Sequence, residues 1–117
     1  MTSYVLYHNP RCSKSRGALE LLQERGIEPQ VVRYLDTPPD AATLRTLVRK
    51  LGIRPRELLR TGEEEYRSLR LADESVGDDA IIEAMAAHPR LIERPILMRE
   101  ERAVIGRPPE RVLELLD

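Results

Sequence analysis

Apolar residues in the first third of the chain follow two different periods. Residues 3–7, SYVLY, form a short run rich in β-favouring side chains, which predicts a buried strand. Between Ser13 and Gly26 the apolar positions recur every three to four residues, which predicts a helix that the glycine ends. Residues 30–35, QVVRYL, predict a second strand. We therefore expect a strand–helix–strand unit with parallel strands.

The middle of the chain has helical periodicity only. One apolar stripe has the spacing i, i+3, i+4, i+7: Leu44, Leu47, Val48 and Leu51. Gly52 follows it and is expected to end that helix. Two shorter helical segments, separated by TGEEE, are expected within residues 54–72. A further helix is expected to be capped by Asp78 or Asp79 and to end at His88.

The last quarter of the chain changes back to strand patterns. Residues 94–108 hold two apolar runs separated by a charged turn, which predicts a hairpin, and residues 109–117 predict a final helix. The whole order predicts an α/β protein with the thioredoxin-like arrangement: β-α-β, a helical insert, then β-β-α, on a mixed four-stranded sheet. We expect a single domain over residues 1–117, with the insert at about residues 40–88.

Composition limits the class of protein. A chain of 117 residues is the size of one domain. Its net charge of −1 and its lack of Phe and Trp argue against nucleic-acid binding. The N-terminus does not resemble a signal peptide, and no apolar stretch approaches the roughly 20 residues that span a membrane. We expect a cytoplasmic protein without a membrane partner.

The only cysteine, Cys12, lies between the predicted first strand and the predicted first helix. Unpaired backbone N–H groups and the positive end of the helix dipole favour a thiolate at that place. The alternative is an inert buried cysteine, but the adjacent Arg11 and Ser13 are unusual neighbours for a core residue. We interpret Cys12 as a nucleophile whose pKa is lowered by the helix and by the positive potential of its sequence neighbours Arg11, Lys14, Arg16 and His8.

Three patterns are absent around this cysteine. There is no C-x-x-C motif, because the third residue after Cys12 is Ser15, so any redox cycle needs an external thiol. There is no C-x5-R phosphatase loop, because its arginine would fall on Ala18. One cysteine with His8 and His88 does not give the ligand spacing of a metal site, so no metal is expected.

The segment YHNPRCSKSR resembles the motif H-N-P-x-C-x-x-S-R of the glutaredoxin-linked arsenate reductases, the ArsC-like family, in a short form related to Spx-type proteins. The resemblance extends through YLDTPP, LGIRPRELLR, HPRLIERPI and IGRPPERVLELL. It implies the thioredoxin-like fold and Cys12 as the nucleophile. It also implies that Arg60, Arg94 and Arg107 bind the oxyanion, and that Pro95 faces the cysteine, with a cis peptide bond expected before it.

The same resemblance implies supporting roles for four residues of the first motif: His8, Asn9, Ser15 and Arg16. The protonated form of His8 lowers the cysteine pKa, or His8 holds the loop by a hydrogen bond. The hydroxyl of Ser15 bonds the thiolate, caps the helix, or does both. No cofactor is expected to stay bound. Arsenate is the implied substrate, glutathione the co-substrate and glutaredoxin the reducing partner.

Two other functions remain open at this point. A glutathione-dependent thiol transferase or oxidoreductase acting on another substrate would need Cys12 but not all three arginines. An Spx-like regulator would bind RNA polymerase, although Ser15 excludes the C-x-x-C switch that many such proteins carry.

Overall fold

The computed structural model describes residues 3–116, and the chain divides into two compact units. The first unit joins the chain up to Thr37 with the chain from Arg94 onward, and the second runs from Pro38 to Glu93. The expectation of a single domain with an insert at about residues 40–88 stays a prediction. The predicted α/β class with a mixed four-stranded sheet is confirmed.

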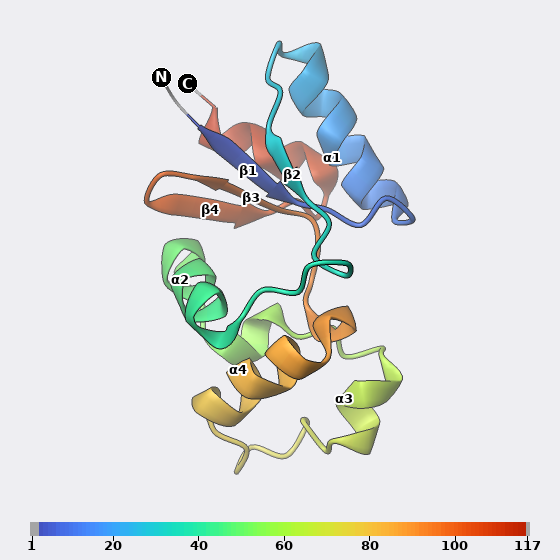
Figure 1. Ribbon diagram of the computed structural model, residues 1–117, viewed down its shortest axis with the longest axis vertical. Helices are drawn as coiled ribbons and strands as arrows, with labels where there is room; N and C mark the ends of the chain where they lie inside the picture. Colours follow the sequence, from blue (N-terminus) through green and yellow to red (C-terminus); the bar gives the residue numbers. More distant parts are fainter. Residues whose placement is uncertain (1–2, 117) are drawn as a thin grey trace. The chain divides into compact units, whose positions relative to one another are not determined.

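The first unit is built on this sheet (Figure 1). Its strands are β1 (Tyr4–Tyr7), β2 (Gln30–Val32), β3 (Ile96–Arg99) and β4 (Arg102–Ile105). They lie in the order β2-β1-β3-β4. β1 pairs with β2 in parallel, whereas β1 with β3 and β3 with β4 are antiparallel. The predicted parallel pair and hairpin are therefore both confirmed.

Strand β2 is shorter than the sequence predicts. The expected strand reached residue 35, but pairing ends at Val32. The carbonyl of Arg33 accepts hydrogen bonds from the N–H groups of Asp36 and Thr37, at 2.9 and 3.0 Å, which turns the chain away from the sheet. The expectation was wrong here because an apolar run looks the same in a strand and in the first part of a turn.

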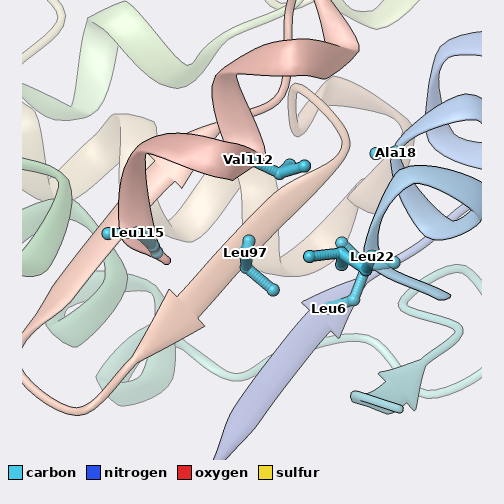
Figure 2. Packing of buried hydrophobic residues seen from close by; sticks show 6 residues of the cluster. All are labelled: Leu6, Ala18, Leu22, Leu97, Val112 and Leu115. Carbon is cyan, nitrogen blue, oxygen red and sulfur yellow. The ribbon is translucent and has the colours of Figure 1, made fainter. Parts of the chain in front are cut away.

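Two helices pack on one face of the sheet. These are α1 (Ser13–Glu24) and the final helix, which is a 3₁₀ helix over Pro109–Leu115. Figure 2 shows the core that they share with the strands, made of Leu6, Ala18, Leu22, Leu97, Val112 and Leu115. Each of these side chains is at most 1% exposed. Burying such side chains is the main stabilising contribution, about 1.5–3 kcal/mol for a large aliphatic one.

The second unit contains the helices of the chain's middle. They are α2 (Ala41–Leu51), α3 (Glu64–Ser68) and α4 (Asp78–Ala87), with 3₁₀ turns at Pro55–Leu58 and Pro89–Leu91. Asp40 caps α2, because its carboxylate accepts a 2.8 Å hydrogen bond from the N–H of Thr43. Gly52 ends α2 as predicted, at a φ of 69°. The cap of α4 is Gly77, not Asp78 or Asp79, which lie in its first turn.

A glycine after β4 allows close packing beside a proline of the first unit. A Cβ atom at Gly106 would lie 2.9 Å from Cγ of Pro95 and 3.0 Å from Cγ1 of Val112. Both neighbours are held, because the Gly106 N–H donates to the Pro95 carbonyl at 2.8 Å and Val112 is fully buried. The glycine is therefore required by space and not by an unusual φ.

We expect Gly106→Ala to lower the free energy of unfolding by about 1–3 kcal/mol, the cost of overpacking a filled site. Urea unfolding followed by circular dichroism measures it. Gly62→Ala is the matched control, because a Cβ there meets no atom within 4 Å. Equal stabilities of the two variants would contradict the steric argument.

Candidate active site

Cys12 is the N-cap residue of α1, where the sequence placed it. The loop before it is held by two hydrogen bonds to Asn9: the Cys12 N–H donates to its carbonyl and the Arg11 N–H to its Oδ1, both at 3.0 Å. The Arg16 N–H donates to the Cys12 carbonyl at 3.0 Å and so joins the loop to the helix. The thiol is partly exposed. The strand-to-helix junction therefore presents the sulfur at the helix N-terminus.

The surroundings of the thiol favour its ionised form. Partial burial raises the pKa of Cys12 and is the largest single influence. The N–H of Ser15, the guanidinium of Arg94 and the N–H of Lys14 act in the opposite direction and together prevail, so the pKa lies below the ordinary thiol value. The neutral thiol makes no cap hydrogen bond of ordinary geometry. We therefore attribute the lowering to stabilisation of the thiolate.

The cation that acts on the thiol is not a sequence neighbour. We expected Arg11, Lys14, Arg16 and His8 to supply the positive field. Instead, Arg94 lowers the thiol pKa through its side chain's hydrogen-bonding and its charge, and Lys14 contributes through its backbone N–H. The Arg16 guanidinium donates to the Pro10 carbonyl at 2.9 Å and supports the loop.

His8 is buried directly behind the loop, with an exposed fraction of 6%. Burial, followed by the charges of Arg33 and Arg16, lowers its pKa. The neutral imidazole is therefore the main form at neutral pH, which argues against the positive-field role. Within residues 3–116, Nδ1 of His8 has no hydrogen-bond partner.

Ser15 and Asn9 form a buried contact beneath the cysteine. The Asn9 N–H donates to the Ser15 hydroxyl oxygen at 3.3 Å, and Ser15 is completely buried. The hydroxyl thus holds the loop, whereas it is the backbone N–H of Ser15 that acts on the thiolate. The N-cap of α1 is Cys12 and not Ser15. The expected hydrogen bond from the Ser15 hydroxyl to the thiolate stays a prediction.

Arg94, Pro95 and Arg107 lie together in the first unit. The Arg107 Nη1 donates to the Arg94 carbonyl at 3.1 Å. The Arg94–Pro95 bond is cis, as expected, and so is the Arg107–Pro108 bond, which was not expected. The structure therefore gathers Cys12, Arg94 and Arg107 from three separate segments of the chain.

Arg60 belongs to the second unit, and there it is held by two carboxylates. Its Nη1 lies 2.7 Å from Oε1 of Glu93, and its Nε lies 3.5 Å from Oε2 of Glu63. Its N–H also donates to the Leu91 carbonyl at 2.8 Å. Its expected role as an oxyanion ligand stays a prediction.

Sequence analysis missed both carboxylates. Glu63 lies in the highly charged segment GEEEYR, a pattern typical of a solvated face, but its side chain is only 18% exposed and also pairs with Arg90 at 3.1 Å. For Glu93, the indication of a functional position in the sequence was its place directly before Arg94 in the motif HPRLIERPI. Charge pairing across separate segments leaves no periodic pattern, so neither carboxylate could be assigned from spacing.

We expect Glu93→Gln to lower the free energy of unfolding by about 1 kcal/mol, because a charge-assisted hydrogen bond that is mostly buried is weakened. Thermal unfolding measures the change. The control is Asp79→Asn, whose partner contact with Arg45 is 3.4 Å long and exposed, and which we expect to be neutral. Equal effects of both substitutions would show that the Arg60–Glu93 pair contributes no more to the free energy of unfolding than a solvent-exposed pair does.

Two other kinds of feature are absent from the part of the chain that the structure describes. Among residues 3–116 no group of three or more His, Cys, Asp and Glu side chains could hold a metal ion. No helix in that range is long and apolar enough to cross a membrane. The expectations of no metal, no bound cofactor and a cytoplasmic location stay predictions.

The chain is similar to a known protein family and to proteins described as arsenate reductases over nearly its whole length. The ArsC family matches residues 7–115. The chain is 56% identical to YfgD of Escherichia coli strain K12, an uncharacterised protein, over 99% of both chains. It is 45% identical to an arsenate reductase of Neisseria meningitidis, over 99% of this chain and 100% of that one. An arsenate reductase structure from Vibrio cholerae has a TM-score of 0.96 at 51% identity, with 98% of each chain covered.

Proposed function

Because the chain belongs to the ArsC family, we propose that it reduces arsenate to arsenite, with Cys12 as the nucleophile and glutathione and glutaredoxin as electron donors. One observation carries the proposal. The cysteine at the N-cap of α1 has a lowered pKa, and an arginine from a distant segment contributes to that lowering. Relatives described as arsenate reductases support the substrate.

The first step is attack of the Cys12 thiolate on the arsenic atom. An oxygen leaves arsenic as water after protonation, and a bond between sulfur and pentavalent arsenic forms. Attack of an anionic thiolate on an oxyanion is opposed by charge repulsion. The guanidinium of Arg94 at the thiol offsets it, since a planar fork of donors matches an oxyanion. Arg107 donates a hydrogen bond to the Arg94 carbonyl, and we assign it a second, assisting contact to the oxyanion.

The second step transfers two electrons to arsenic. The glutathione thiolate attacks the Cys12 sulfur, and the sulfur–arsenic bond breaks with its electron pair going to arsenic, which leaves as arsenite. A disulfide between Cys12 and glutathione remains. Glutaredoxin attacks the glutathione sulfur and regenerates the Cys12 thiolate. A lone cysteine suits this scheme, because the second and third thiols come from other molecules.

A coupled assay tests the proposal. Purified protein is mixed with arsenate, glutathione, glutaredoxin and glutathione reductase, and NADPH consumption is recorded while each component is omitted in turn. We expect consumption that requires arsenate, glutathione and glutaredoxin. Turnover that does not depend on arsenate but occurs with a glutathionylated substrate would contradict the arsenate reductase proposal. It would indicate a thiol transferase.

A further inference from the structure

A polar groove lies beside the nucleophile loop in the first unit. Its volume is about 250 Å³, and it is lined by residues 8–11, Arg33, Leu35 and Asp36. These residues come from the turn after β1 and from the turn after β2. Figure 1 shows the arrowheads of the two parallel strands at the same end of the sheet. Ligands of open α/β sheets bind outside the carboxyl ends of the strands, which is where this groove lies.

The walls of the groove are held by backbone hydrogen bonds. The His8 N–H donates to the Val32 carbonyl at 2.9 Å and joins the two walls. The bonds to Asn9 described above shape the first turn, and those to the Arg33 carbonyl shape the second. The groove is therefore a preformed feature of the fold and not a gap between loose side chains.

The charges in the groove match a peptide that carries both carboxylates and an ammonium group. Arg11 and Arg33 supply two cations, and Asp36 supplies one anion. The Nε of Arg33 lies 3.7 Å from Oδ2 of Asp36, with both side chains more than half exposed, so this pair is weak and a ligand can replace it. His8 is mainly neutral, as its lowered pKa indicates, so the arginines provide the positive field.

We propose that this groove binds the γ-glutamyl end of glutathione, which carries both a carboxylate and the ammonium group, an assignment that rests on the proposed thiol-dependent reduction. Arg11 and Arg33 hold a carboxylate, and Asp36 lies near the ammonium group. Arg11 immediately precedes Cys12, so a peptide held here can extend its thiol to the cysteine sulfur. The volume is below the roughly 300 Å³ of sites that enclose a whole ligand, so the groove holds one end of the tripeptide.

This groove is formed without Arg94 or Arg107. Recognition of the co-substrate and recognition of the oxyanion therefore use different arginines. A substitution at Arg33 should raise the KM for glutathione and leave the KM for arsenate unchanged. The opposite split is expected when Arg107 is replaced.

The test measures thiol–disulfide exchange at Cys12, which needs no arsenate. The Cys12 thiolate attacks one sulfur of glutathione disulfide, forms a mixed disulfide and releases a glutathione thiolate. The second-order rate is measured by mass spectrometry with glutathione disulfide and with the uncharged 2-hydroxyethyl disulfide. We expect Arg33→Ala and Arg11→Ala to lower the ratio of the two rates by about threefold to tenfold, the size of one partly exposed ion contact.

The matched control is Arg102→Ala, an exposed arginine of the hairpin in the same unit, which should leave the ratio unchanged. An equal fall in both rates, or an equal fall in the control, would overturn the groove assignment. A lowered ratio without arsenate-dependent turnover would support the groove and overturn the arsenate reductase proposal. Turnover with an unchanged ratio would overturn the groove alone.

Discussion

Cys12→Ser is expected to reduce arsenate-dependent NADPH consumption to the background rate. A serine hydroxyl at the same N-cap is not ionised near neutral pH and cannot form the disulfide that the second step requires. Loss of a covalent nucleophile can cost on the order of 10⁶-fold in kcat. The fold should persist, because the side chain is partly exposed and makes no cap hydrogen bond of ordinary geometry.

Ser13→Ala is the control for this substitution, since it changes an exposed side chain at the first position of α1 without touching the sulfur. Circular dichroism of all three proteins confirms that the variants fold. If Cys12→Ser kept the wild-type rate, the covalent scheme would be untenable and with it the role assigned to the helix N-terminus.

Arg94→Ala is expected to lower kcat/KM for arsenate by about 10²–10³-fold, the usual effect of removing one preorganised charge from a reaction centre. It should also move the alkylation of Cys12 by iodoacetamide to higher pH. The thiolate is the reacting form, so the alkylation rate rises with pH through the cysteine pKa. The guanidinium helps to lower that pKa, and its removal raises it.

Arg90→Ala is the matched control, because Arg90 is exposed, four residues away in the chain, and pairs with Glu63. Arg94→Lys should restore part of the pH shift, because it keeps the charge but loses the planar fork of donors. An alkylation profile of Arg94→Ala that matched the wild type would mean that the backbone N–H groups alone hold the thiolate.

Local patterns predicted most of the first unit. The run at β1, the periodicity of α1 and the two apolar runs of the hairpin are each visible within a short window, so the strands and helices follow from them. The errors fall where the outcome depends on hydrogen bonds: the turn at Arg33 that shortens β2, and the choice of Gly77 to cap α4. Both are decided by backbone groups that an apolar pattern does not describe.

The sequence by itself determined that a lone thiol stands between a strand and a helix, because both elements and their junction are local. Only the tertiary structure decided which charges reach that thiol. Arg94 does so from the segment before β3, whereas Arg16 is turned to the Pro10 carbonyl and His8 stays neutral. It likewise paired Arg60 with Glu63 and Glu93. Electrostatic interactions depend on distance in space and on burial, and neither follows from proximity along the chain.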